Sequence, residues 1–386
     1  MSPAGSPLKG GNAGFPEGVS RRLSLRIGPV LSRLRKEELP VWVVGGALRD
    51  LLLGRPFRDV DLVVRASREQ VASRFPEGVW VGRVIPAFVL ESKIGKRGTT
   101  VQITVIAGSL EEELARRDFS VNAMAMRLSG RGGPGAFLVD PFGGLGDLSA
   151  GRLRRPCRIR DPFSEDPIRV LRLVRFAATL GFVVEPETLD LAGRSCGLLA
   201  GVAGERRRQE LLIFFGGRWL RRLPGIVPMP FLGEVLSQAG GFATPLSEKA
   251  CANVPFLLAL AERHSRLDPL FRLWVFYRGI GRGIGRGIGT EAGAMARSLP
   301  FSRSERRRLL RWDRLAGFLE EQRAGPWSAA DRSLLMNDDH REKIVRMVER
   351  TVEPRARKAF RRWWNEVVAT LCRPWEEVRG MLSGSE

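Results

Sequence analysis

Residues 41–64 read VWVVGGALRDLLLGRPFRDVDLVV, and this stretch decides the fold of the first part of the chain. The apolar run Val41–Val44 predicts a short buried strand, and Gly45-Gly46 predicts a tight turn directly after it. Ala47–Leu53 has the apolar spacing of a helix, and Val60–Val64 predicts a second strand. The order strand, glycine turn, helix and strand allows the glycines and the start of the second strand to face one pocket.

Two carboxylates, Asp59 and Asp61, flank Val60 at the start of that second strand. Because residues two apart on a strand face the same side, both side chains can be aimed at one point. A hard cation such as Mg²⁺ prefers oxygen ligands, and two ions about 3.5–4 Å apart can activate a hydroxyl and neutralise a leaving pyrophosphate. The backbone N–H groups of Gly45-Gly46 and the following helix N-terminus suit a triphosphate. Taken alone, an Asp-x-Asp motif more often marks a surface turn than a metal site. A Gly-Gly pair taken alone can mark just a tight turn.

The segments around this stretch predict a mixed α/β unit. We expect a helix over Arg21–Lys36, and a second helix that starts at the capping box of Ser109 and Glu112 and runs to Arg117. Asp140–Gly144 marks a loop. Three further β-rich runs are expected at Val79–Val84, Ala87–Lys93 and Thr99–Ile106.

Beyond about residue 160 the strand signals fade and helical periodicity takes over. Arg278–Gly289 repeats Arg-Gly-Ile-Gly and is too rich in glycine to hold a helix, so it predicts a flexible loop. Ser302–Glu321 and Arg341–Met381 predict basic helices with interleaved tryptophans (Trp312, Trp363, Trp364 and Trp375), which either line an RNA groove or form solvated faces over an aromatic core. Earlier helices are expected at Ser164–Leu180, Pro186–Cys196 and Glu205–Phe215.

Composition favours a polyanionic partner, since 63 Lys and Arg against 42 Asp and Glu give a formal net charge of +21. The alternative is that arginine serves only for solvation. The first twenty residues lack the apolar run of a signal peptide, and no stretch is long enough to span a bilayer, so we expect a cytoplasmic protein without a membrane partner. Two histidines, neither beside a plausible nucleophile, argue against hydrolytic triads. Four cysteines without CxxC spacing predict neither a zinc site nor a disulfide framework: Cys157, Cys196, Cys251 and Cys372.

Four ordered motifs resemble those of class II tRNA nucleotidyltransferases and bacterial poly(A) polymerases. In chain order they are residues 43–50 (VVGGALRD), 58–61 (RDVD), 116–125 (RRDFSVNAMA) and 165–169 (EDPIR). With 140–145 and Glu205-Arg206 the resemblance covers roughly residues 41 to 215, and the rest of the chain matches only in being helical. It implies an α+β nucleotidyltransferase head, with a mixed sheet and helices, followed by an all-α neck, body and tail.

The resemblance also implies domain bounds and roles for single residues. The expected parts are a disordered tail (1–20), the catalytic head (21–155), a neck with the base-reading motif (156–220), a body (221–300) and a basic tail that binds tRNA (301–386). Asp59 and Asp61 are implied to be catalytic and to hold Mg²⁺. The implied nucleotide-binding residues are Gly45, Gly46 and Arg49 for the triphosphate, Arg117, Asp118 and Asn122 in the nucleotide pocket, and Asp166, Arg169 and Arg172 in the base-reading motif.

Asp166 and Arg169 can read a base edge if they share one face of a helix, because they then present an acceptor beside a donor. Cytosine and adenine both offer an amino group next to a ring nitrogen that accepts. Uracil and guanine reverse this pattern and would leave groups unpaired at roughly 1–3 kcal/mol each. The pair can therefore select CTP and ATP without a template, which is the role the resemblance gives it. The alternative is an intrahelical ion pair with Arg169 and Arg172 merely solvated.

The sequence departs from the family pattern at two places. Family members usually carry a glutamate in the strand after the Asp-x-Asp hairpin. In this sequence Gln102 stands at that position. An amide cannot replace a charged metal ligand or a base. Only Ala107-Gly108 separates that strand from the capping box, where family members have a longer flexible loop. Loss of this loop is typical of members that add only the two cytidines.

We therefore expect a Mg²⁺-dependent tRNA nucleotidyltransferase that adds C and/or A residues from CTP and ATP to the tRNA 3′ end without a template, releasing pyrophosphate. The short connection hints at addition of CC only. A poly(A) polymerase of the same family is one alternative. A catalytically inactive RNA-binding paralogue is the other, and Gln102 motivates it.

Overall fold

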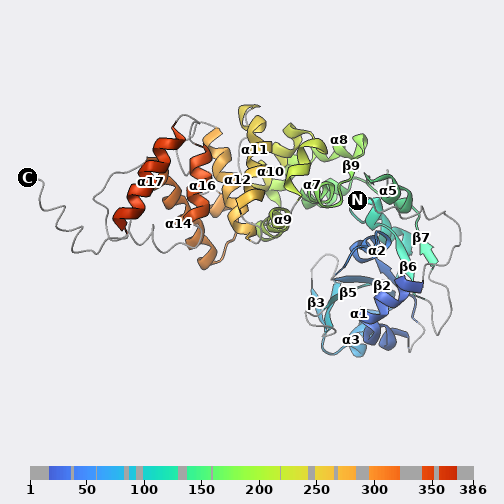
Figure 1. Cartoon of the computed structure of the whole chain (residues 1–386). Coiled ribbons are helices and arrows are strands. Elements are labelled where there is room, and N and C mark those ends of the chain that lie inside the picture. The colour runs from blue at the N-terminus through green and yellow to red at the C-terminus, as the bar shows by residue number, and fades with distance from the viewer. Residues whose placement is uncertain are drawn as a thin grey trace, which may run out of the picture. The chain divides into compact units, whose positions relative to one another are not determined.

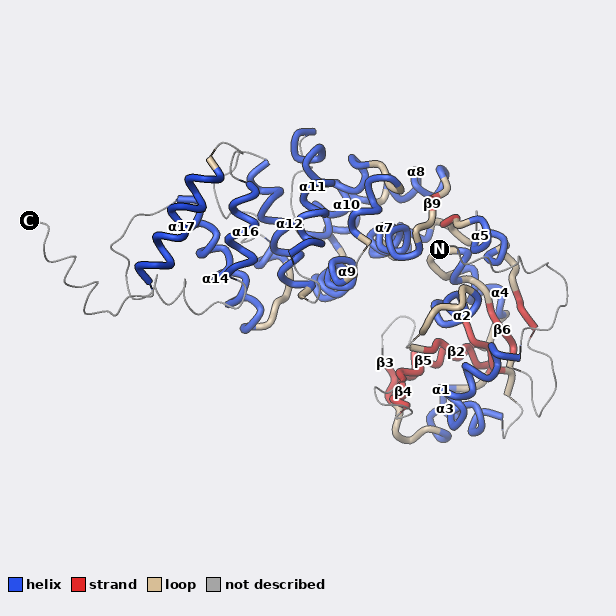
Figure 2. The backbone as a smooth tube through the Cα atoms, in the orientation of Figure 1, coloured by secondary structure: helices blue, strands red, loops and turns tan. Residues whose placement is uncertain are grey.

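The computed structural model divides the chain into two compact units (Figures 1 and 2). The N-terminal unit comprises Met1–Arg169 and Phe182–Ala192, and the helical unit comprises Val170–Gly181 and Gly193–Glu386. The structure describes residues 17–35, 39–57, 59–81, 87–92, 99–128, 137–157, 160–217, 219–241, 248–264, 268–283, 295–321, 341–351 and 356–371.

The described part of the N-terminal unit is built on a seven-stranded sheet in the order β3-β4-β5-β2-β1-β6-β7 (Figure 2). Its central pair, β2 and β5, runs parallel, and every other neighbouring pair runs antiparallel. The strands are β1 (Val41–Val44), β2 (Val60–Arg65), β3 (Val79–Val81), β4 (Ala87–Ser92), β5 (Thr99–Ile106), β6 (Ala125–Arg127) and β7 (Phe137–Val139).

Helices pack on both faces of this sheet. On one face Trp42, Val63 and Ile106 form a core with Leu110 and Leu114 of α4. On the other face Phe88 of β4 lies 6.5 Å from Phe75, which follows α3. The helices are α1 (Glu17–Arg35), α2 (Gly45–Leu52), α3 (Arg68–Arg74), α4 (Leu110–Ala115) and α5 (Gly144–Ala150), and a 3₁₀ turn η1 covers Ser120–Asn122.

The expected elements of this unit are present with small shifts at their ends. α2 begins at Gly45 rather than Ala47, and α4 ends at Ala115 rather than Arg117. The predicted capping box is confirmed, because Ser109 and Glu112 each accept from the other's backbone N–H. The predicted disordered tail is wrong for its last residues: α1 begins at Glu17, where an acidic side chain suits the helix N-terminus, and residues 1–16 lie outside the described residues.

The remaining described elements are almost entirely helical, which confirms the predicted α+β head followed by an all-α part. Their core is aromatic: the rings of Phe271, Trp274 and Trp312 lie 5.1–5.8 Å apart. The elements are β8 (Arg152–Leu153), α6 (Pro162–Glu165), α7 (Ile168–Leu180), β9 (Val183–Val184), α8 (Pro186–Arg194), η2 (Cys196–Gly201), α9 (Gly204–Gly216), η3 (Leu220–Gly225), α10 (Met229–Gly240), α11 (Glu248–His264), α12 (Pro269–Gly283), α14 (Arg303–Glu321), α16 (Arg341–Thr351) and α17 (Arg357–Leu371).

A loop prediction and a helix prediction beyond residue 277 differ from the structure. The expected loop at Arg278–Gly289 starts too early, because α12 continues to Gly283. There the Arg278 guanidinium is buried and paired with Asp313 and Glu320, a tertiary contact that overrides the low helix propensity of glycine. The expected helix Arg341–Met381 is two helices, α16 and α17. Residues 284–289 and 372–381, with Trp375, lie outside the described residues.

The three described tryptophans of the basic helices pack into the core. Trp312 and Trp364 are buried, and Trp363 packs against Phe318 at 6.2 Å. The helices therefore do cover an aromatic core, and both alternatives for their basic faces, an RNA groove and a solvated surface, stay predictions. Among the described helices, none combines the length and apolar character that crossing a membrane requires.

Candidate nucleotide and metal site

The glycine turn and the second aspartate lie in contact at one end of the sheet. Val44 pairs with Asp61 across the β1–β2 ladder, so Gly45 follows directly beside that carboxylate. Gly45 has φ +70°, and a Cβ built on it would lie 2.7 Å from Asp61 Oδ2 and 2.9 Å from Arg117 Nη1. Only glycine fits this position without strain. Asp59, one residue before β2, is exposed, and the prediction that its side chain shares the side of Asp61 stays a prediction.

The guanidinium of Arg117 lies between two carboxylates. Its Nη1 is 3.8 Å from Asp61 Oδ2, and its Nη2 is 3.5 Å from Glu113 Oε1, one turn earlier along the chain. The Arg117 side chain is only 17% exposed, so this positive charge is largely withdrawn from bulk water. Arg117 therefore provides a fixed cation directly above the Gly45 turn.

Arg49, Asp118 and Asn122 form a buried hydrogen-bond chain. Arg49 Nη1 donates to Asn122 Oδ1 at 2.8 Å, and Asn122 Nδ2 donates to Asp118 Oδ1 at 2.8 Å. Asp118 Oδ1 also accepts from the backbone N–H of Phe119 at 2.9 Å, and Arg49 reaches Asp50 at 2.9–3.0 Å. The structure thus brings the three residues together, and each is at most 8% exposed. Their assigned contacts with a nucleotide stay a prediction.

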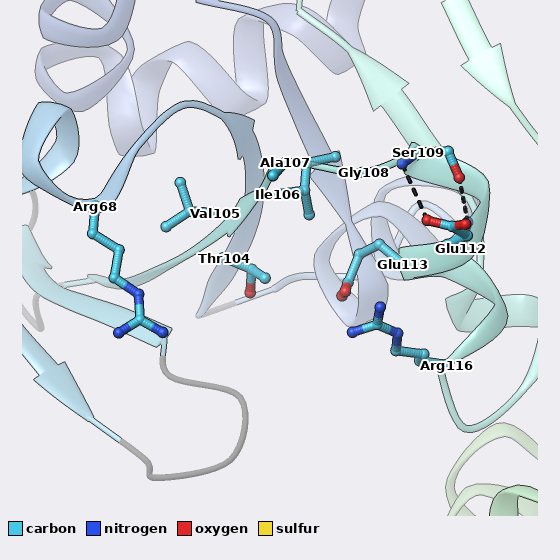
Figure 3. A pocket seen from close by; sticks show the side chains of 10 residues that line it. All are labelled: Arg68, Thr104, Val105, Ile106, Ala107, Gly108, Ser109, Glu112, Glu113 and Arg116. Atoms are coloured by element: carbon cyan, nitrogen blue, oxygen red, sulfur yellow. Dashed lines mark hydrogen bonds between the residues drawn. The ribbon is translucent and has the colours of Figure 1, made fainter.

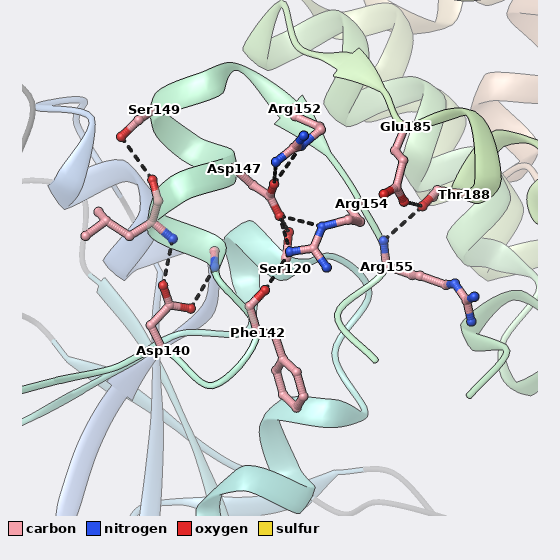
Figure 4. Close-up of polar contacts among 12 residues, drawn as sticks. Ser120, Asp140, Phe142, Asp147, Ser149, Arg152, Arg154, Arg155, Glu185 and Thr188 are labelled. Carbon is pink, nitrogen blue, oxygen red and sulfur yellow. Dashed lines mark hydrogen bonds and ion pairs between the residues drawn. The ribbon is translucent and has the colours of Figure 1, made fainter. Parts of the chain in front are cut away.

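Asp147 anchors the 3₁₀ turn that carries Asn122 (Figure 4). This carboxylate is 1% exposed and accepts from Ser120 Oγ at 2.6 Å, Arg152 Nε at 2.7 Å and Arg154 Nε at 3.0 Å. The sequence reasoning missed Asp147, because an acid in a glycine-rich segment carries no sign of burial. The arginines five and seven residues later are the signal that could have indicated a buried ion cluster.

Asp140 and Gly144 complete this anchor. Asp140 accepts from the backbone N–H groups of Gly144 and Leu145 at 2.7 and 2.9 Å, and so caps α5. A Cβ on Gly144 would lie 2.2 Å from the Ser120 carbonyl oxygen, so α5 approaches η1 at a distance that only glycine permits.

The base-reading residues are arranged differently from the prediction. Asp166 is extended (φ −147°, ψ 90°) between α6 and α7, because the residue before a proline, here Pro167, is driven out of the helical region. The predicted continuous helix over Ser164–Leu180 is therefore wrong, and Asp166 and Arg169 do not share a helix face.

Arg169 and Arg172 have defined partners. Arg169 Nη2 donates to the Arg116 carbonyl oxygen at 2.5 Å and Nη1 to that of Pro162 at 3.2 Å. Arg169 thus lies beside the start of the Arg-Arg-Asp motif. Arg172 belongs to the helical unit, where its Nε lies 3.7 Å from Glu210 Oε1.

Gln102 occupies the place next to Asp61 on the parallel β2–β5 ladder, and its side chain is exposed on the same face. Among the described residues no group of three or more His, Cys, Asp and Glu side chains gathers around one point. The site therefore offers the two carboxylates of Asp59 and Asp61. That donor set fits Mg²⁺, which proteins commonly hold by one or two carboxylates while substrate phosphates and water complete the shell.

The buried Cys196 of the helical unit is not a reactive thiol. Burial, and secondarily the charge of Glu234, raises the pKa of the Cys196 thiol to about 12. The thiolate is the reactive form, so Cys196 is unreactive at neutral pH.

Comparisons with known proteins find similar sequences for this part of the chain. Residues 41–154 match the family described as the Poly A polymerase head domain. A CC-adding tRNA nucleotidyltransferase from Halalkalibacterium halodurans is 37% identical over 183 residues, 47% of this chain and 46% of the relative. A CCA-adding enzyme from Geobacillus stearothermophilus is 31% identical over 271 residues, 64% of this chain and 65% of the relative. The chain thus spans less than two thirds of the length of each.

Solved structures extend the likeness to the helical part. A Thermotoga maritima CCA-adding enzyme in complex with tRNA has a TM-score of 0.64 at 22% identity, with 92% of this chain and 86% of that chain covered. A Bacillus stearothermophilus CCA-adding enzyme in complex with CTP has a TM-score of 0.61 at 23% identity, covering 96% and 89%. These likenesses show the fold.

Proposed function

Because residues 41–154 of this chain match the Poly A polymerase head domain, we propose that the chain is a template-independent tRNA nucleotidyltransferase. It adds C and/or A residues from CTP and ATP to the tRNA 3′ end and releases pyrophosphate. The observation that carries the proposal is the contact of Asp61 with the Gly45 turn beneath Arg117. At this point a carboxylate that can hold a metal ion lies next to backbone N–H groups that can bind phosphates.

Each side chain has a distinct task in the proposed reaction. Asp59 and Asp61 would hold Mg²⁺, which supplies charge that favours deprotonation of the RNA 3′-hydroxyl and stabilises the departing pyrophosphate. Backbone N–H groups at the start of α2, together with Arg117, bind the triphosphate, and the missing Cβ of Gly45 allows close approach. The Arg49–Asn122–Asp118 chain holds the floor of the nucleotide pocket rigid. A cytoplasmic location fits these substrates.

Addition of CC only is the repertoire that we propose. Two residues, Ala107 and Gly108, connect β5 to the Ser109 cap of α4, so the site has no long loop at this point that could rearrange for ATP. The similarity to a relative named CC-adding supports the same choice.

A primer-extension ladder tests the proposal. The full chain is incubated with Mg²⁺, CTP, ATP and a tRNA lacking its last three nucleotides, and products are resolved at single-nucleotide resolution. We expect two cytidines and no further product. Three additions would indicate complete CCA synthesis, a long adenosine tract a poly(A) polymerase, and no extension an RNA-binding paralogue.

Base choice is tested with the double variant Asp166→Ala/Arg169→Ala. The two residues do not share a helix face, but the Arg169 backbone N–H donates to the Asp166 carbonyl oxygen at 3.0 Å, and the proposal is that they read the base edge from this turn. We expect incorporation of UTP and GTP to rise relative to CTP, because the proposed acceptor and donor are both removed. Arg169 also holds the Arg116 carbonyl, so a purely structural role predicts slower extension with unchanged selectivity. That result would remove the base-reading assignment.

We also propose that the basic helices of the last part of the chain bind tRNA. Exposed cations on α14 and α17 support this, since phosphate contacts release counterions and make affinity fall steeply with salt. They are Arg303, Arg306, Arg307, Arg308, Arg314, Arg357, Lys358, Arg361 and Arg362. If tRNA affinity does not change with salt concentration, these arginines and the lysine are ordinary solvated surface residues.

A further inference from the structure

The Arg117 guanidinium adjoins the proposed metal ligand and the proposed phosphate turn at the same time. Its Nη1 is 3.8 Å from Asp61 Oδ2, the carboxylate proposed to hold Mg²⁺. The same Nη1 is 2.9 Å from the point that a Cβ of Gly45 would occupy, so it also faces the turn proposed to bind the triphosphate. One positive charge therefore lies where two oppositely charged ligands, a cation and a polyphosphate, are expected to meet.

Glu113 attracts this guanidinium from the other side. Its Oε1 is 3.5 Å from Arg117 Nη2. The neighbouring Glu112 is bound to Ser109 in the capping box, and Glu113 is turned away from Ser109 (Figure 3). The side chains of Glu113 and Arg117 are 12% and 17% exposed, so water and salt screen their charges only weakly.

The two carboxylate contacts of Arg117 are both longer than a direct hydrogen bond of about 2.7–3.2 Å. The guanidinium is therefore attracted by Asp61 and by Glu113 without being locked to either. A small rotation of the side chain is enough to change the charge that Asp61 experiences, because the interaction of two charges grows steeply as they approach.

A guanidinium and a divalent cation compete for one carboxylate. An ion bound to Asp61 lies beside Arg117 and carries charge of the same sign, so the two repel each other in a partly buried site. Arg117 in this position therefore lowers the affinity of Asp61 for Mg²⁺. A triphosphate has the opposite influence, because its oxygens attract the planar guanidinium and the Gly45 turn lies directly beside it.

We propose that Arg117 couples the two ligands: it neutralises Asp61 until a triphosphate draws it onto the Gly45 turn, and so makes metal binding depend on the nucleotide. The inference rests on the proposed function and adds a regulation of the same site. Mg²⁺ alone then binds Asp61 weakly and enters the site with the nucleotide. A ligand shifts such an equilibrium only by its different affinity for the two arrangements, and here the phosphate charge supplies that difference.

Two binding measurements on the full chain distinguish this coupling from a plain phosphate contact. Mn²⁺ affinity is measured by electron paramagnetic resonance without nucleotide, and CTP affinity by equilibrium dialysis in EDTA. In Arg117→Gln we expect Mn²⁺ affinity to rise about tenfold and CTP affinity to fall about tenfold, since one charge opposes the first ligand and attracts the second. General damage to the site would lower both affinities. Arg127→Gln, which removes an exposed arginine of β6, is the matched control and should change neither.

The gain in Mn²⁺ affinity has to act through Asp61. Asp61→Ala/Arg117→Gln should therefore bind Mn²⁺ no more tightly than Asp61→Ala alone. Glu113→Gln is an independent variant that changes the same charge in the opposite direction: Arg117 loses its attraction toward α4, and Mn²⁺ affinity should fall.

Three results would overturn the coupling. They are an unchanged or lower Mn²⁺ affinity in a folded Arg117→Gln, a gain that persists without Asp61, and a higher Mn²⁺ affinity in Glu113→Gln. If the wild type still extends tRNA, each of these leaves the proposed function standing. A chain that neither binds CTP nor extends tRNA would overturn both.

Discussion

Replacing Gly45 by alanine probes the contact on which the site depends. The new Cβ would lie 2.7 Å from Asp61 Oδ2 and 2.9 Å from Arg117 Nη1. Asp61 would have to retreat to beyond about 3.4 Å to reach ordinary van der Waals contact. Alanine would also have to adopt φ +70°, which L-residues avoid.

The two penalties can be separated with a second glycine. The left-handed conformation costs alanine about 1–2 kcal/mol. Gly54 has φ +68°, but no atom lies within 4 Å of the point that a Cβ would occupy, so Gly54→Ala carries this conformational cost alone. Gly45→Ala carries the same cost and in addition moves the proposed catalytic carboxylate of Asp61 by several tenths of an ångström. Because a shift of 1 Å costs about 10²-fold in rate, we expect kcat to fall by roughly 10- to 100-fold.

Urea unfolding and primer extension measure the two effects. Both variants should lose about 1–2 kcal/mol of unfolding free energy, and only Gly45→Ala should lose most of its rate. If Gly45→Ala extends tRNA at the wild-type rate, the reaction does not require the Asp61 carboxylate to lie at its position beside the Gly45 turn. If Gly54→Ala is equally slow, the loss in both arises from stability and the geometric reasoning fails.

Three other changes test neighbouring groups. Asp61→Ala should abolish extension and leave tRNA affinity in a filter-binding assay nearly unchanged; loss of both would make Asp61 structural. Gln102→Glu places a third carboxylate beside Asp61, so the Mg²⁺ concentration for half-maximal rate should fall severalfold, and an unchanged Mg²⁺ titration would contradict the ladder assignment. Glu113→Gln releases Arg117 to close on Asp61, which should weaken Mn²⁺ binding measured by electron paramagnetic resonance. Glu111→Gln on the same helix is its control, and equal effects of the two would refute a specific role for Glu113.

Much of the fold follows from local signals in the sequence. Short apolar runs such as Val41–Val44 and the alternation in β5 locate the strands, and the family resemblance found in the four motifs is confirmed by the head-domain match and the relatives. The meeting of Gly45 and Asp61 was also predictable, because a single helix separates two strands that pair directly. These features depend on neighbours in the chain.

Features that depend on distant partners were not predictable in the same way. Asp147 is recognisable as a buried anchor only once Ser120 and the two arginines surround it. Arg278 holds a glycine-rich segment in helical form through carboxylates more than thirty residues away. Asp166 is a different case, because the sequence shows the proline that follows it and this proline indicates a break in the helix. The apparent helical periodicity of Ser164–Leu180 favoured a continuous helix instead.

The parallel pairing of β2 with β5 has a consequence for biosynthesis. Parallel neighbours need a long crossover, and here α3, β3 and β4 are made before β5 can be inserted. Closing this loop carries an entropic cost that slows folding. A nascent chain that ends before Thr99 leaves the β2 edge beside Asp61 bare, as a template on which another chain can aggregate. Insertion of β5 therefore completes the surroundings of the proposed metal site and covers this exposed edge in the same folding event.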